Sequence, residues 1–218
     1  ISHDEVVYMK GSLRGKMPGD EWRQLAGVRS FMVYMLTHPG KKLTFMGAEL
    51  GQWHEWDFAS QLDWYLLENK ENQQTQRFFK DINRFYLSQS PLWDIDFSWE
   101  GFEWLVADDN HNNIVVFVRR DRKGRELIAA VNFSPVGRAD YRFGVPPKKM
   151  YREVFTTDLP AYGGTGDWRN EGELLTESIP SHGKPCSLCV TIPPLGAVFF
   201  AGEGEWQEEE KTNEPPEV

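Results

Sequence analysis

The sequence contains little cysteine: Cys186 and Cys189 are the only two in 218 residues. Two cysteines make no disulfide framework, so we expect a reducing compartment and a cytoplasmic location. Their C-x-x-C spacing does not indicate zinc, because zinc needs four ligands and no second pair or histidine cluster accompanies them. A separation of three along a strand also points two side chains to opposite faces. We therefore expect unreactive thiols, no metal and no cofactor.

Positive charge and long apolar runs are also lacking. Lys and Arg number 24 against 33 Asp and Glu, which gives a net charge of −9. Because nucleic-acid binding relies on clustered Lys and Arg, we expect no nucleic-acid partner. No apolar run reaches the roughly 18 residues of a membrane-spanning helix, so we expect no membrane partner. Aromatic residues are plentiful, with nine Trp; most should be core, and some suit contacts with sugars or proteins.

The first part of the chain has a helical and α/β pattern. Asp20 is a candidate N-cap, apolar residues then recur at helical spacing, and Pro39-Gly40 ends the helix. A short buried strand at 43–46, a long Trp-rich loop over 48–67 and a second helix ending before Pro91 follow. Such alternation is typical of a parallel sheet or barrel, which two strands cannot complete. Because the chain also starts at Ile1, we expect a piece of a longer protein.

After Pro91 the apolar period changes from 3.6 to 2, which indicates strands separated by turns. Such a series predicts an antiparallel sandwich or barrel. We predict domains over 1–91 and 92–202, and a disordered acidic tail over 203–218. The expected strands are Phe102–Ala107, Ile114–Arg119, Leu127–Phe133, Tyr141–Val145, Tyr151–Thr156, Ser187–Ile192 and Ala197–Ala201.

The residues best suited to chemistry stand near the N-terminus, in Ser2-His3-Asp4-Glu5. A Ser/His/Asp triad is excluded there, because consecutive residues of a strand alternate faces and cannot align. What remains is an imidazole and a carboxylate at the end of an apparent strand, which in a barrel is where catalytic groups lie. From composition alone, the start of a solvated loop is the favoured interpretation.

Several motifs together resemble glycogen branching enzymes of the α-amylase clan, over residues 2 to about 202. Ser2-His3-Asp4-Glu5-Val6-Val7 with Gly15-Lys16-Met17-Pro18-Gly19-Asp20 is similar to the family's fourth conserved region and following loop. Other segments resemble the eighth barrel strand, its loop and the C-terminal β-domain: Phe45-Met46-Gly47, Gly51-Gln52-Trp53, Glu55-Trp56, Gly101-Phe102-Glu103-Trp104 and Tyr162-Gly163-Gly164-Thr165-Gly166. The chain departs from the family at Met9, where glycine is usual, and at Tyr8, Ala48 and Leu50; these departures concern loop shape and substrate contacts.

The resemblance implies the last strands and helices of a (β/α)8 barrel followed by an antiparallel β-sandwich. It also implies a reaction that cleaves α-1,4-glucan and transfers the segment to a 6-hydroxyl, with retention of configuration, in glycogen biosynthesis. Retention needs a nucleophile and an acid/base, which the family places upstream of Ile1. Asp4 matches the carboxylate that stabilises the transition state, and His3 matches a hydrogen-bond donor to the same sugar. The implied partners are an α-glucan, such as glycogen or amylose, and the upstream part of the same barrel.

Trp53 and Trp56 are the candidate substrate-binding residues, since aromatic faces in water-accessible loops stack on sugar rings. The alternative is that they pack the loop onto the rest of the chain. Two alternatives also stay open for the function: another α-amylase-clan enzyme, or a non-catalytic module that binds glucan or supports a neighbouring domain. The glycine-rich segment 162–166 predicts a tight turn, because no clear helix follows it to form a phosphate cradle.

Overall fold

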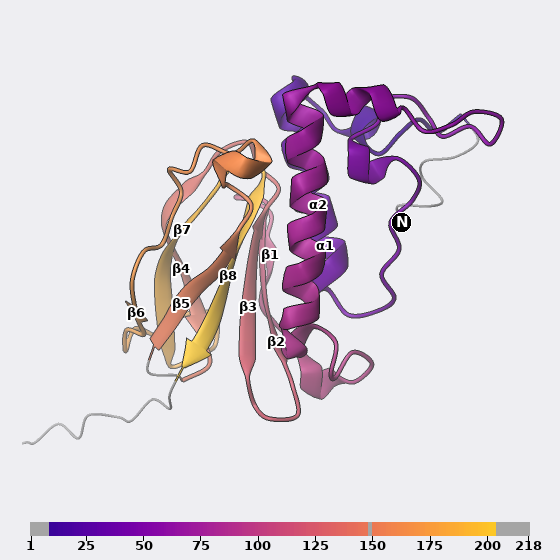
Figure 1. Ribbon diagram of the computed structural model, residues 1–218. Coiled ribbons are helices and arrows are strands. Elements are labelled where there is room, and N and C mark those ends of the chain that lie inside the picture. Colours follow the sequence, from indigo (N-terminus) through magenta and orange to yellow (C-terminus); the bar gives the residue numbers. More distant parts are fainter. Residues whose placement is uncertain (1–8, 148–149, 204–218) are drawn as a thin grey trace, which may run out of the picture.

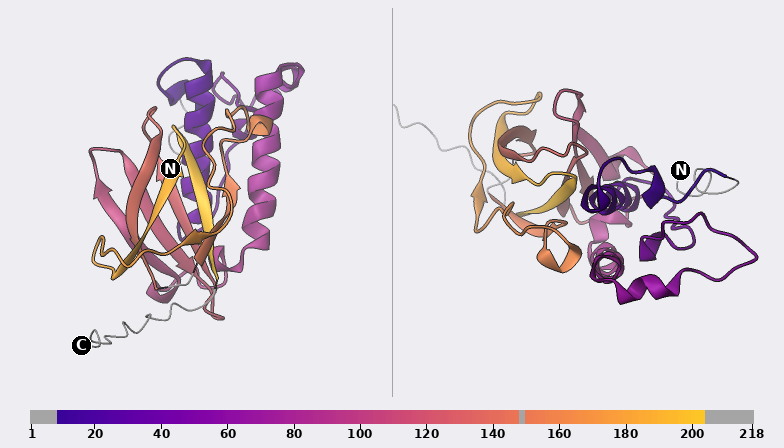
Figure 2. Two further views of the ribbon diagram at one scale, coloured as in Figure 1. Left: turned by 90° about the vertical axis from the view of Figure 1, so that its left-hand side faces the viewer. Right: turned by 90° about the horizontal axis from the view of Figure 1, so that it is seen from above.

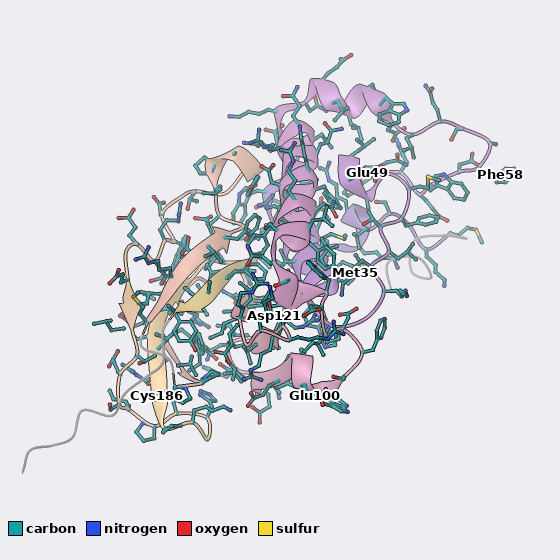
Figure 3. All side chains as sticks on the ribbon, turned by 60° about the horizontal axis from the view of Figure 1, so that its bottom comes forward. Met35, Glu49, Phe58, Glu100, Asp121 and Cys186 are labelled. Atoms are coloured by element: carbon teal, nitrogen blue, oxygen red, sulfur yellow. The ribbon has the colours of Figure 1, made fainter. Side chains whose placement is uncertain are left out.

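The computed structural model describes residues 9–147 and 150–203, which form three layers. Two long helices cover one face of a six-stranded sheet, and a two-stranded sheet covers the other face (Figures 1 and 2). The Trp-rich loop lies on the far side of the helices from the strands (Figure 1). Phe58 is 87% exposed at the tip of this loop (Figure 3).

Helix α1 spans Glu21–Thr37 and begins as predicted at Asp20. The Asp20 carboxylate accepts the backbone N–H of Arg23 at 2.9 Å, which satisfies one of the donors left open at a helix start. The helix ends at an extended His38, because the residue before Pro39 avoids helical geometry. Its buried apolar side chains recur at helical spacing: Leu25, Val28, Met32, Val33 and Leu36.

Helix α2 spans Lys70–Ser88 and packs on the sheet. Phe78, Ile82 and Phe85 repeat at three- and four-residue spacing, so they form one buried face. The ring of Phe85 stacks on Phe155 at 4.7 Å between centroids. Both helices therefore bury their apolar faces in a core that they share with the strands.

The large sheet has the order β1-β2-β3-β8-β5-β6, and its pairs are antiparallel. Its strand β3 is buried on both sides. Leu127, Ala129 and Val131 face the helices, whereas Ile128 and Ala130 face the small sheet, as the strand period of two requires. The bounds are β1 Phe102–Asp109, β2 Ile114–Arg120, β3 Glu126–Asn132, β5 Met150–Thr156, β6 Leu174–Leu175 and β8 Gly196–Glu203.

The small sheet pairs β4 (Arg138–Val145) with β7 (Cys186–Ile192). Its apolar face packs on the large sheet, so the predicted β-sandwich is present. Cys186 is buried and Cys189 is half-buried in β7. Burial raises the pKa of both thiols, which disfavours the reactive thiolate and agrees with the prediction of unreactive cysteines.

The seven predicted strands are all present, with ends shifted by a few residues, and β6 was not predicted. The strand predicted at 43–46 is wrong for this structure. Residues 41–45 adopt no regular structure, and Leu43 and Met46 are more than half exposed. A parallel strand is held by hydrogen bonds to neighbouring strands, and the strand pairs among the described residues are all antiparallel. The barrel and the boundary at 91 stay predictions.

Short 3-10 helices join these elements. The predicted Trp-rich loop contains two of them, and another lies within the turn that resembles the family's glycine-rich segment. Their bounds are η1 Arg14–Lys16, η2 Ala48–Leu50, η3 Trp64–Glu68, η4 Ser90–Leu92, η5 Trp99–Gly101 and η6 Pro160–Tyr162.

Arg119 of β2 fastens the end of α1 to the sheet. Its guanidinium donates to the carbonyl of Thr37 at 2.7 Å, to the carbonyl of Gly101 at 3.1 Å and to Asp96 at 2.9 Å. The Arg119 side chain is 0% exposed. Because the Thr37 carbonyl belongs to the last turn of the helix, a cation there satisfies an open acceptor and complements the helix dipole.

The tight turn predicted at 162–166 is present as part of a longer turn over 158–166, which holds the helices to the β-domain at the other end. The Asp158 carboxylate accepts backbone N–H groups of Thr165 and Gly166, both at 2.9 Å. Trp22 of α1 donates to the carbonyl of Gly163 at 2.7 Å, and Gln74 of α2 donates to the carbonyl of Pro160 at 2.8 Å. The two helices therefore have a fixed position on the sheet.

Candidate functional site

His3 and Asp4, to which the resemblance assigns catalysis, lie outside the described residues, so their roles stay predictions. The structure does describe the segment that follows them, residues 9–16, and the Trp-rich loop that this segment contacts. Ser12 donates its hydroxyl to the carbonyl of Trp53 at 2.8 Å, and Arg14 donates to the carbonyl of Gly51 at 3.3 Å. Two segments separated by 37 to 41 positions are thereby joined.

Trp53 lies half-exposed on this junction. The residue is 49% exposed, and the guanidinium of Arg14 lies 5.5 Å from the ring centroid. Arg14 is itself held by the carboxylate of Glu21 at 2.5 Å. The cation contact orients the indole while leaving it accessible to water. This placement is compatible with stacking on a sugar, which stays a prediction.

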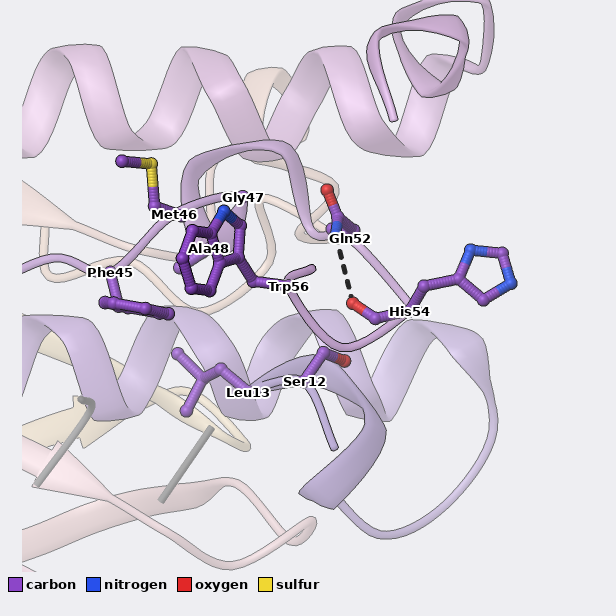
Figure 4. Close-up of a pocket in the computed structure, with 9 residues that line it drawn as sticks. All are labelled: Ser12, Leu13, Phe45, Met46, Gly47, Ala48, Gln52, His54 and Trp56. Carbon is purple, nitrogen blue, oxygen red and sulfur yellow. Dashed lines mark hydrogen bonds between the residues drawn. The ribbon is translucent and has the colours of Figure 1, made fainter. Parts of the chain in front are cut away.

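Trp56 is more enclosed than Trp53. It is half-buried and meets Phe45 edge-on, with 5.4 Å between the ring centroids. It lines a small pocket between the residues just before η1 and the loop around η2 (Figure 4). The other lining residues are Ser12, Leu13, Phe45, Met46, Gly47, Ala48, Gln52 and His54. The pocket volume is about 10 Å³, room for about one water molecule, so Trp56 packs the loop here and the pocket holds no sugar ring.

Gln52 organises the floor of this pocket. Its amide donates to the carbonyl of His54 at 3.1 Å and accepts the backbone N–H of Asp63, also at 3.1 Å (Figure 4). A Cβ atom at Gly47 would lie 2.7 Å from the Gln52 amide oxygen, and Gly47 has a φ of 83°, so only glycine fits. The ring of His54 points away from the pocket and contacts Asp63 at 2.9 Å.

Glu55 is the residue whose role the sequence analysis did not identify. Its two carboxylate oxygens accept the backbone N–H groups of Met9 and Gly11, at 2.7 and 2.9 Å. Met9 has a φ of 63°, in the left-handed region that favours glycine. The sequence did contain one indication of this role, since Met9 stands where the family usually has glycine. A residue other than glycine in such a turn needs stabilising contacts from another part of the chain.

Two further properties concern the described residues only. In ranges 9–147 and 150–203, no group of three or more His, Cys, Asp or Glu side chains is placed to hold a metal ion. In the same ranges, neither helix is long and apolar enough to span a bilayer.

A family model matches the strands that this structure places in the sandwich. The model describes the alpha amylase C-terminal all-beta domain, and it matches residues 104–203, from β1 to β8. Residues 104–203 are therefore similar to an alpha-amylase C-terminal all-beta domain. The antiparallel architecture of this domain is the part of the predicted fold that is confirmed.

Relatives extend the similarity beyond the all-beta domain. The 1,4-alpha-glucan branching enzyme GlgB of Aquifex aeolicus is 47% identical over 205 residues, covering 94% of this chain. The enzyme of the same name from Rubrobacter xylanophilus is 48% identical over 92% of the chain. The chain spans 32% and 28% of the lengths of these two relatives. The resemblance to branching enzymes inferred from the motifs is confirmed.

Solved structures share the fold. A pullulanase of group B Streptococcus matches with a TM-score of 0.58 at 14% identity, over 84% of this chain and 28% of its own. The catalytic module of the pneumococcal glycogen-degrading virulence factor SpuA also has a TM-score of 0.58, at 11% identity, over 84% of this chain and 32% of its own. At these identities the likeness concerns the fold alone.

Proposed function

We propose that this chain is part of a 1,4-α-glucan branching enzyme, which cleaves an α-1,4 bond and rejoins the segment to a 6-hydroxyl. The observation that carries the proposal is the similarity to branching enzymes along nearly the whole chain, at 47% identity over 94% of its residues. The Trp-rich loop supports it, because it presents an accessible indole next to the segment that follows His3 and Asp4.

In the proposed reaction, Asp4 stabilises the positive charge that develops on the sugar, and His3 donates a hydrogen bond to the same sugar. A charge-assisted contact that tightens as the ring flattens lowers the barrier, because it is stronger in the transition state than in the ground state. The nucleophile and the acid/base, which must lie roughly 5–5.5 Å apart for retention, belong to the remaining part of the barrel.

The helical layer supports this arrangement. A groove of about 630 Å³ runs between segment 43–49 and α2, and Leu43 and Met46 are exposed beside it. Phe79, Lys80 and Asn83 of α2 line its other side. We assign this groove to the upstream part of the same barrel, whose neighbouring strands would let residues 43–46 form the strand predicted from the sequence.

Product analysis of the longer polypeptide tests the proposal. On amylose it should create α-1,6 linkages, visible as new anomeric proton signals, with no release of soluble sugar. Asp4→Asn should lower turnover about a hundredfold or more, because it removes a transition-state charge while keeping the shape. Soluble oligosaccharides without new branches would indicate another clan enzyme instead.

The 218-residue chain alone should not act on amylose, and its retention on a glycogen affinity gel would instead favour a binding module. A cytoplasmic location stays part of the proposal, to be tested by cell fractionation.

A further inference from the structure

We infer that Glu55 is a positioning residue: its carboxylate fixes the turn Met9–Gly11, which follows Asp4 closely in the sequence. Met9 follows Asp4 by five positions. The inference rests on the proposed function, because it gives Glu55 a part in the reaction of Asp4. It adds a residue that acts through the backbone rather than by touching the substrate.

The geometry of the turn is that of an anion-binding nest. Met9 and Gly11 have positive φ values of 63° and 78°, whereas Lys10 between them is not among the residues of positive φ. Alternating backbone handedness makes successive N–H groups converge on one point, where an anion is favoured. Here that anion is the Glu55 carboxylate, with one oxygen 2.7 Å from the Met9 nitrogen and the other 2.9 Å from the Gly11 nitrogen.

The turn needs this support because Met9 does not favour its own conformation. A side chain in the left-handed region crowds the backbone, and the Met9 side chain is 97% exposed, so packing does not compensate. Gly11 tolerates its φ without cost, and a Cβ there would meet nothing within 4 Å. The two charge-assisted hydrogen bonds from Glu55 therefore hold a strained turn in place.

Glu55 is itself anchored to the rigid part of the molecule. Ser12 binds the carbonyl of Trp53, two residues before Glu55. The amide of Asn72 in α2 donates to the carbonyl of Leu50 at 2.6 Å, at the start of the same loop. These hydrogen bonds, together with the backbone of the Trp-rich loop, connect α2 to the turn. A displacement of about 1 Å at a catalytic group can cost roughly a hundredfold in rate, so a turn that is held less firmly should lower turnover.

The test uses the longer polypeptide and amylose as substrate. Glu55→Gln keeps the size of the side chain and replaces one acceptor oxygen by an amide nitrogen, which cannot accept an N–H. We expect kcat to fall about tenfold with KM within about twofold of its original value. Adding Met9→Gly should restore most of the lost kcat, because glycine adopts a positive φ without strain. Glu68→Gln is the control: it makes the same charge change on an exposed residue at the end of η3.

Amide exchange gives a readout that does not depend on activity. In the 218-residue chain, Glu55→Gln should speed exchange at Gly11 about tenfold or more, with the amides of β3 unchanged as evidence of an intact fold. Unchanged exchange at Gly11 would overturn the inference. So would a rise in KM at constant kcat, or a failure of Met9→Gly to restore kcat, since either outcome indicates direct contact with substrate.

The two proposals fail in different ways. If Asp4→Asn leaves turnover intact, the catalytic role that the proposed function gives to Asp4 is wrong. If Asp4→Asn abolishes turnover while Glu55→Gln leaves kcat intact, the proposed function stands and the positioning role is wrong.

Discussion

The attachment of the helices to the β-domain can be tested at Arg119. We expect Arg119→Met to lower the free energy of unfolding by about 3–5 kcal/mol, the usual cost of breaking a buried ion pair by removing one partner. The variant loses hydrogen bonds to the Thr37 and Gly101 carbonyls and to Asp96. The Asp96 side chain is only 12% exposed, and without Arg119 its remaining ion-pair partner is Lys42, whose Nζ lies 3.9 Å from the carboxylate. Methionine fills the space of the aliphatic stem, so the loss comes from the polar contacts.

Arg122→Met is the matched control for this prediction. Arg122 also binds an aspartate, Asp94, at 2.7 Å, but its side chain is 74% exposed. An exposed pair contributes about 0–1 kcal/mol, so this variant should remain close to the original stability. Guanidinium denaturation followed by Trp fluorescence and far-UV circular dichroism measures both. Equal, small losses in the two variants would refute the role assigned to Arg119.

Two further predictions concern acid stability and the tryptophans. Burial raises the pKa of Asp121, but hydrogen bonds from Ser90 and Arg125 outweigh it and lower the pKa to about 2. Asp121 therefore stabilises the fold above its unfolded pKa of about 4, and this contribution is lost as pH falls toward 2. Asp121→Asn should be clearly destabilising at pH 7 and nearly neutral at pH 2; equal losses at both would contradict this. In the longer polypeptide, Trp53→Ala should raise KM for amylose about threefold to tenfold, whereas Trp56→Ala should lower the melting temperature, and the reverse pattern would exchange their roles.

The helices and strands could be predicted from the sequence because their apolar residues keep a strict period. Leu127 to Val131 form a short apolar run that predicted a strand, and the structure then showed that this strand is buried on both faces. The two-residue strand β6 carries too short a pattern to be detected. Residues 43–46 have the composition of a buried strand, but the part of the chain that the structure describes offers them no parallel neighbour, and composition does not supply one.

The contacts of the site could be predicted only in part. The motifs drew attention to Trp53 and Trp56, but their different environments depend on Arg14 and Phe45, which are distant in sequence. The role of Glu55 depends on the backbone φ of Met9 and on a contact across 46 positions. Long-range hydrogen bonds of this kind have no local sequence signature, so they require a structure.

A chimera tests the central claim most directly. The chain should replace the matching 205-residue region of the Aquifex aeolicus branching enzyme, to which it is 47% identical. Incubated with amylose and analysed by proton NMR, the chimera should form α-1,6 linkages, and the same chimera with Asp4→Asn should form almost none. A folded chimera that forms no branches, or that keeps its activity with Asp4→Asn, would contradict the assignment of this chain and of its catalytic carboxylate.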